Sequence, residues 1–203
     1  MANVAQADAA EIPFDRVWRE QTFPFKAPND WFLGSKRLGL QSEGSVSLIY
    51  RQLDSSFWRA RNASWQWSVQ ESVPPTDLTR KGGDDRNLAL YFLFLPEQSA
   101  KKMEGASLSR VLRNREARAL VYVHGGAHQV GLPIISPYLG PRGMTIPLQP
   151  AEPGTDQQSV NLDADFRKLF RTMPGVLFGL AISGDSDDTS SKISADLSGL
   201  ELR

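Results

Sequence analysis

The chain contains no cysteine, so disulfides, thiolate metal ligands and a cysteine nucleophile are all excluded. Its two histidines, His124 and His128, are four residues apart, but Gly125 and Gly126 between them disfavour the helix that a metal site of this spacing requires. Basic and acidic side chains balance at 23 each, so no overall charge directs the protein toward nucleic acid. No run approaches the ~18 apolar residues of a membrane-spanning helix.

The composition is that of an ordinary globular chain. Its 203 residues are 40% hydrophobic and 23% charged, and this length suffices for one substantial core. We expect a disordered terminal segment over 1–10 and a single domain over 11–203. The first ten residues are not an intact signal peptide, but they resemble the small-residue region around a cleavage site. We therefore expect a periplasmic or secreted protein, with a cytoplasmic location as the alternative.

Alternation of apolar and polar residues dominates the chain. In the segment 63–70, Trp65 and Trp67 alternate with polar residues, which is typical of a half-buried strand with both tryptophans on the core side. The segment 88–95 carries no charge at any position, as in a central strand covered on both faces. Further strands are predicted over 45–53, 119–123, 144–148, 176–183 and 193–202.

Helical patterns are few. The segment 161–172 carries apolar residues at helical spacing, has Asp163 and Asp165 in its first turn, and ends before Pro174. A short basic helix is predicted over 107–115. Many short strands with one or two short helices in the connections predict an all-β fold, an antiparallel β-sandwich of the jelly-roll type.

The segment around His124 combines a predicted strand with a glycine pair. Gly125 and Gly126 predict a turn at the end of the strand 119–123. The His-Gly-Gly sequence resembles the oxyanion loop of esterases, but the chain lacks the Gly-x-Ser-x-Gly nucleophile elbow that this chemistry needs. Tyr122 and His124 are two residues apart and share a face of the strand, so we expect both to line a ligand pocket.

A first acidic turn precedes the apolar strand 88–95. It contains, in order, Arg80, Lys81, Gly82, Gly83, Asp84, Asp85 and Arg86. Residues just before a central strand lie at one end of the sheet, where a rigid element positions them. Two adjacent carboxylates in such a place need a compensating charge or a ligand.

A second acidic turn follows the predicted strand 176–183. Asp185, Asp187 and Asp188 supply carboxylate oxygens, which are the hard type of ligand that Ca²⁺ selects. An EF-hand is excluded because Ser190 stands where that loop requires glycine and because the flanking segments are predicted strands. The alternative is a solvated turn, for which Asp, Ser and Gly are the usual residues.

The two acidic turns adjoin two strongly apolar strands. If these strands are neighbours and their ends coincide, up to five carboxylates converge, and that many cannot lie close together without cations or protons. Two arrangements meet this requirement: an ion-pair network with Arg80, Lys81 and Arg86, or a bound Ca²⁺. A purely structural network is not obviously favourable, because burying it costs desolvation.

Several segments occur in an order that resembles one bacterial protein family. They are ASWQWSV, DLTRKGGDDRNLALYFLF, ALVYVHG, VNLDADFRKLF and GLAISGDSDDTSSKISADLSGLEL. The chain resembles domain-of-unknown-function family 3047 over about residues 10–203, and the Lys-Gly-Gly-Asp-Asp and Asp-x-Asp-x-Thr stretches are the most specific parts. This resemblance supports the architecture and the two acidic turns as site candidates, and it implies no activity. The final SADLSGLEL is also similar, more distantly, to the closing strand of carbohydrate-binding jelly-roll modules.

These observations favour a non-enzymatic binding module of the bacterial cell envelope that recognises a glycan or another small polar ligand. The expected ligand-binding residues are Arg80, Lys81, Asp84, Asp85, Arg86, Tyr122 and His124. The expected Ca²⁺ ligands are Asp84, Asp85, Asp185, Asp187 and Asp188, and no organic cofactor is expected. There are two alternatives: a glycan-active hydrolase in which two of these carboxylates act as general acid and base, and a domain whose acidic edge binds a protein partner.

Overall fold

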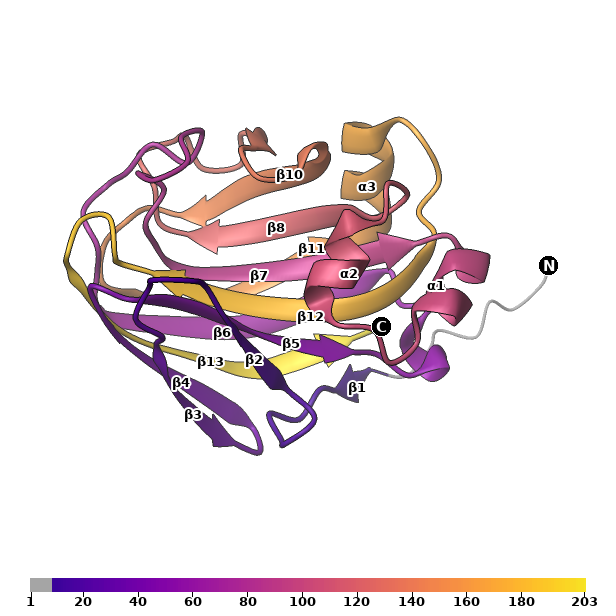
Figure 1. Cartoon of the computed structure of the whole chain (residues 1–203), viewed down its shortest axis with the longest axis horizontal. Coiled ribbons are helices and arrows are strands. Elements are labelled where there is room, and N and C mark those ends of the chain that lie inside the picture. The colour runs from indigo at the N-terminus through magenta and orange to yellow at the C-terminus, as the bar shows by residue number, and fades with distance from the viewer. Residues whose placement is uncertain (1–8) are drawn as a thin grey trace.

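The computed structural model describes residues 9–203 and consists of two β-sheets packed face to face (Figure 1). The six-stranded sheet contains, in spatial order, β11 (Gly154–Asn161), β6 (Asn62–Glu71), β13 (Lys192–Leu202), β4 (Arg37–Glu43) and β3 (Asp30–Gly34), with β1 (Ala10–Glu11) paired to β13. The seven-stranded sheet contains β2 (Arg19–Thr22), β5 (Val46–Gln52), β12 (Val176–Asp185), β7 (Arg86–Leu95), β8 (Arg118–His124), β10 (Gly140–Gln149) and β9 (Ile134–Ser136). All neighbouring strands are antiparallel except β8 and β10, which are parallel.

The main core lies between the two sheets. The inward side chains of β6 include Trp65 and Trp67, which are almost completely buried, so the predicted core position of both tryptophans is confirmed. The ring of Trp65 lies 5.8 Å from that of Tyr122 and 6.0 Å from that of Phe92, both from the opposite sheet. Burial of large aromatic side chains between the sheets is the main source of their stability.

The two sheets differ on their outer faces. The outer face of β6 carries polar residues such as Gln66 and Ser68, as in an antiparallel sheet that faces water. The outer face of the seven-stranded sheet is apolar instead, and Ala89, Leu93 and Val121 form a second buried cluster there. The strand β7 is buried on both faces, which explains why the segment 88–95 carries no charge.

Three short α-helices lie in the connections. They are α1 (Glu97–Met103), α2 (Leu108–Arg113) and α3 (Leu162–Phe170), and a 3₁₀ turn covers Ser55–Phe57. The helix α2 lies across the outer face of the seven-stranded sheet (Figure 1). The helix α3 begins where the Asn161 side chain accepts a hydrogen bond from the Ala164 amide, and it ends at Arg171, which adopts a left-handed conformation.

The predicted all-β sandwich is confirmed, and each predicted strand and helix has a counterpart. The sequence patterns missed α1, β9, β11 and the strands before residue 45, and the helices number three instead of one or two. Residues 1–8 of the expected terminal segment lie outside the described residues, whereas Ala10 pairs with Leu202. Among residues 9–203, no helix is long and apolar enough to cross a membrane.

Candidate functional site

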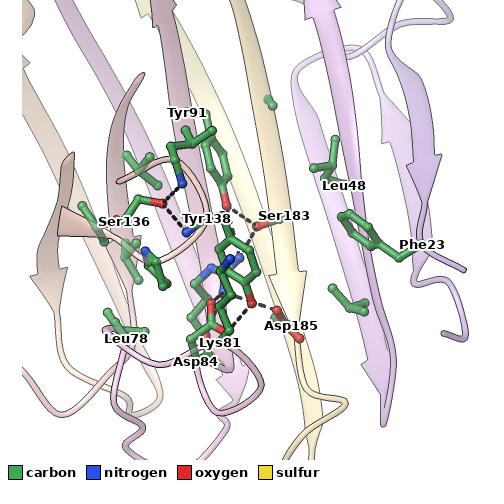
Figure 2. Close-up of a pocket in the computed structure, with 18 of the residues that line it drawn as sticks. Phe23, Leu48, Leu78, Lys81, Asp84, Tyr91, Ser136, Tyr138, Ser183 and Asp185 are labelled. Atoms are coloured by element: carbon green, nitrogen blue, oxygen red, sulfur yellow. Dashed lines mark hydrogen bonds and ion pairs between the residues drawn. The ribbon is translucent and has the colours of Figure 1, made fainter. Parts of the chain in front are cut away.

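A cavity of about 440 Å³ lies on the outer face of the seven-stranded sheet. Its floor consists of alternate residues on neighbouring strands (Figure 2), and residues of loops and of α2 form its walls. The floor residues are Val46, Leu48, Tyr91, Leu93, Val121, Val123, Thr145, Ala181 and Ser183. Side chains alternate across a strand, so the residues between these positions pack in the core and the outer set is free to line a cavity.

Most of the cavity wall is apolar. Leu108 and Leu112 of α2 pack in the same cluster as Leu93 and Val121 of the sheet. Phe23, from the loop after β2, lies beside Leu48 on the opposite side of the cavity (Figure 2). A wall of this kind favours apolar parts of a ligand, because their burial removes apolar surface from water.

One end of the cavity is polar and is organised by Arg86. Its Nη1 donates to Oδ2 of Asp84 at 2.9 Å and to Oδ2 of Asp185 at 3.3 Å. Its Nη2 donates to the hydroxyl oxygens of Tyr91, at 3.1 Å, and Ser183, at 3.3 Å. The guanidinium is nearly buried and remains charged at any physiological pH, so it binds two carboxylates and two hydroxyls at this end of the cavity.

Tyr138 extends this polar end from the turn after β9. Its hydroxyl donates to Oδ1 of Asp84 at 2.6 Å, and the ammonium of Lys81 lies 5.6 Å from the centre of its ring. Burial and the hydrogen bond to Asp84 raise the pKa of Tyr138, so its hydroxyl stays protonated. Figure 2 shows Tyr138, Lys81 and Asp84 grouped at this end. They form a rim of donors and acceptors around an otherwise apolar cavity.

The two acidic turns meet behind this rim. Asp85 is completely buried, and its Oδ2 accepts hydrogen bonds from the amide and the hydroxyl of Thr189 at 2.8 and 2.5 Å. Asp187 forms an ion pair with Lys26, which comes from the loop after β2. The pairing of β7 with β12 places Asp185 opposite Arg86 and so brings the first turn to the second.

Asp185 is the most perturbed carboxylate of the group. Burial raises its pKa to about 7; Arg86 opposes this shift, and the nearby carboxylates of Asp85 and Asp84 add to it. Its Oδ2 accepts from Arg86, whereas its buried Oδ1 has no hydrogen-bond partner among residues 9–203. Asp185 therefore lies where a proton or a cation would lower its energy.

The structure brings together most of the residues that the sequence selected. Asp84, Lys81 and Arg86 line the cavity with Asp185, Asp187 and Asp188. Asp85 lies directly behind them, in contact with the second turn. Arg80 is exposed and is not part of the cavity lining. That these residues bind a ligand or a metal stays a prediction.

The expectation that Tyr122 and His124 line the pocket is corrected by the structure. Both side chains are 1% exposed and lie between the sheets, where His124 packs against Trp67 at 5.5 Å. The Tyr122 hydroxyl donates to Asp165 of α3 at 2.6 Å. The two residues do share a face of β8, but it is the core face, and Val121 and Val123 face the cavity instead. The predicted glycine turn is present, with positive φ at both glycines.

The sequence did not select the polar residues that contact Arg86 or the acidic turns from elsewhere in the chain, namely Lys26, Tyr91, Tyr138 and Ser183. A signal existed for Ser183, because it stands two residues before Asp185 on the same strand and therefore on the same face. Lys26 and Tyr138 reach the site from loops far away in the sequence, and no local pattern marks them.

Comparisons with solved structures give distant likenesses of shape. The family 11 xylanase from Neocallimastix patriciarum matches with 9% identity and a TM-score of 0.48, over 97% of this chain and 99% of that chain. The xyloglucanase domain of NopAA, a type three effector from Sinorhizobium fredii, matches with 7% identity and a TM-score of 0.46, over 97% and 98%. The K3 cleaved adhesin domain of Lys-gingipain from Porphyromonas gingivalis matches with 12% identity and a TM-score of 0.43, over 94% and 93%. At these scores and identities the likenesses indicate nothing about ligand or activity.

Comparisons of sequence give a single assignment. A search of the curated proteins found no match. The model of a protein family of unknown function, DUF3047, matches residues 16–201, which include both acidic turns and every strand from β2 to β12. The resemblance seen in the sequence motifs is thereby confirmed, and the chain belongs to the DUF3047 family.

Proposed function

We propose that the protein is a binding module that takes a small amphipathic molecule into the cavity on its seven-stranded sheet. The observation that carries this proposal is the division of the cavity into a long apolar wall and one polar end. The apolar wall suits a hydrocarbon or ring system of the ligand. The polar end offers the hydroxyls of Tyr91 and Ser183 to a head group.

The head group is proposed to be rich in hydroxyls, as in a sugar. Protein hydroxyls both donate hydrogen bonds to such groups and accept hydrogen bonds from them, which agrees with the glycan expectation from the sequence. A glycan without an apolar part would place many hydroxyls against leucines, where they lose their hydrogen bonds to water. A sugar that carries an alkyl or acyl chain satisfies both parts of the cavity.

A binding role is favoured over hydrolysis by the state of the carboxylates. A general acid or base must reach the substrate, but Asp84 is already held by Arg86 and Tyr138, and Asp185 is buried beside the same guanidinium. Release of free sugar from an oligosaccharide mixture or from an alkyl glucoside would overturn this choice in favour of the hydrolase. The location in the cell envelope stays a prediction.

Filling the cavity is expected to weaken binding at least tenfold. Ala181 lies on the cavity floor, and the Ala181→Leu substitution adds three carbons there. The neutral fluorescent probe N-phenyl-1-naphthylamine measures occupation of the apolar part, and octyl glucoside competes for the same space. Overpacking costs about 1–3 kcal/mol, and 1.4 kcal/mol is a factor of ten in affinity.

The matched control is Ala164→Leu, the same substitution at an exposed position of α3. It should leave probe binding unchanged. Leu112→Trp, at the partly exposed edge of the cavity on α2, provides a second filling variant if Ala181→Leu proves unstable. If both filling variants bind the probe as tightly as the wild-type protein, the ligand does not enter this cavity.

The polar end is tested separately by Tyr91→Phe, which removes one hydroxyl. This variant should bind octyl glucoside about threefold to tenfold more weakly, as expected for one hydrogen bond of about 0.5–1.5 kcal/mol, and should bind N-phenyl-1-naphthylamine unchanged. Free glucose should compete poorly in both proteins, because it lacks the apolar part. Equal loss for both ligands would mean that Tyr91 maintains the shape of the cavity and does not contact the head group.

A further inference from the structure

Three carboxylates from two loops lie within coordination distance of one another. One oxygen from each of Asp85, Asp185 and Asp187 lies within 4.8 Å of the other two. Asp185 is the last residue of β12 and Asp85 directly precedes β7, so two paired strands position the group. Opposite oxygen ligands of a Ca²⁺ ion lie roughly 4.6–5.2 Å apart, twice the Ca–O distance. The three oxygens are therefore close enough together to bind one Ca²⁺ ion.

Asp185 gives an independent indication of a ligand. Its side chain is 8% exposed, and its Oδ1 is buried without a hydrogen-bond partner among residues 9–203. A buried polar oxygen without a partner is costly, and native proteins nearly always satisfy such atoms. No N–H or O–H donor of the described chain reaches this oxygen, so it needs either a proton shared with a neighbouring carboxylate or a bound cation.

The cations near the group do not compensate all of its carboxylates. Arg86 and Lys26 are the cations in contact with the acidic turns in the described chain. Asp85 receives hydrogen bonds from neutral donors alone among the described residues. Lys26 pairs with Asp187, and its side chain is 44% exposed, so it can turn into solvent without losing a buried contact. The group can therefore accept further positive charge at little structural cost.

We propose that Asp85, Asp185 and Asp187 bind one Ca²⁺ ion at the polar end of the cavity. The ion contacts the unpaired oxygen of Asp185 and replaces Lys26 at Asp187. Carboxylate oxygens are the hard ligands that Ca²⁺ prefers, and its flexible coordination number allows water to complete the shell. This inference does not depend on the molecule proposed for the cavity, because the three named ligands are protein oxygens.

Calcium alone is the probe. Protein dialysed against a chelator and then freed of it is titrated with calcium chloride and, in parallel, with magnesium chloride. Isothermal titration calorimetry should give one calcium ion per chain. Calcium at a hundredfold excess over its Kd should raise the melting temperature by about 5 °C or more. Magnesium should act more weakly, because it requires a tighter octahedral shell.

Two variants separate an ion site from a structural ion-pair network. Asp187→Asn should weaken calcium binding at least tenfold, and Lys26→Met should strengthen it several-fold because it removes the competing cation. Lys101→Met, which removes an exposed lysine from its ion pair with Glu97 on α1, is the matched control and should bind calcium like the wild-type protein. A structural network predicts the opposite for Lys26→Met, namely lower stability and no response to calcium.

The proposal is overturned if calcium produces no calorimetric signal and no change in melting temperature in both the wild-type protein and Lys26→Met. It is also overturned if folded Asp187→Asn, checked by circular dichroism, binds calcium as tightly as the wild-type protein. An equal response to magnesium and calcium would indicate diffuse attraction to the acidic turns and would likewise exclude the site.

Discussion

Replacing Arg86 with methionine is expected to destabilise the protein by about 3–5 kcal/mol, the range found when one partner of a buried ion pair is removed. The guanidinium is 9% exposed and contacts the buried carboxylates of Asp84 and Asp185 at 2.9 and 3.3 Å. Methionine has a similar length but leaves both carboxylates without their counter-charge. Urea denaturation at neutral pH, with a chelator present to remove any bound cation, measures the change in the free energy of unfolding.

Arg37→Met is the matched control, because it breaks an ion pair of better geometry on the surface. Arg37 donates to both oxygens of Asp196 at 2.7 and 2.6 Å, but its side chain is 68% exposed. Water solvates the released carboxylate there, so the loss should stay below about 1 kcal/mol. Adding Asp185→Asn to Arg86→Met should restore part of the lost stability. If Arg86→Met loses no more than Arg37→Met, the polar end is solvated and our account of its charges is wrong.

Lowering the pH from 7 to 4 is expected to reduce the stability by about 3 kcal/mol through His124 alone. Burial between the sheets lowers the pKa of His124 to about 4, and the carboxylate of Asp156 on β11 only partly opposes this shift. In the unfolded chain the imidazole takes up a proton near pH 6.5. Between about pH 6.5 and pH 4 the unfolded state therefore binds a proton that the folded state does not bind. The free energy of unfolding falls as the pH is lowered through this range.

His124→Asn should remove this component of the pH dependence. The free energy of unfolding is measured by urea denaturation at pH 7 and pH 4 for the variant and for the wild-type protein. The loss of unfolding free energy between the two pH values is then compared between the variant and the wild-type protein. Because the carboxylates titrate in both proteins, the difference between the two losses is due to His124. Leu120→Val, a buried substitution on the same face of β8 that involves no titratable group, is the control and should retain the wild-type difference. An unchanged difference in His124→Asn would mean that His124 is protonated in the folded protein.

The alternation of residues in the sequence was sufficient to assign the core of the six-stranded sheet. In β6, Trp65 and Trp67 share a face with Ala63 and Val69 while the other face is polar, so a single local pattern specifies which side is buried. In the final strand β13, Ile193, Ala195 and Leu197 follow the same alternation, whereas Leu200 reaches the inner face only through a register shift after Ser198, which the alternation does not predict. A strand that is buried on one side alternates apolar and polar residues, because one face contacts the core and the other contacts water.

The alternation could not assign the faces of β8. Both of its faces are apolar, so the pattern shows that Tyr122 and His124 share a face but not which face it is. That choice depends on where β8 lies in the sheet and on α2, which covers the outer side. Two-sided burial removes the contrast between faces, and only tertiary packing decides which one borders the cavity.

The acidic turns show the same division between sequence and structure. The sequence by itself determined that each turn adjoins a strongly apolar strand and is therefore held by a rigid element. Tertiary packing makes β7 and β12 antiparallel neighbours, which puts Asp85 beside Asp185, and it brings Lys26 to Asp187, 161 residues away in the sequence. The physical reason is that local patterns record burial, whereas the convergence of charges depends on strand order, and strand order is set by packing of the whole chain.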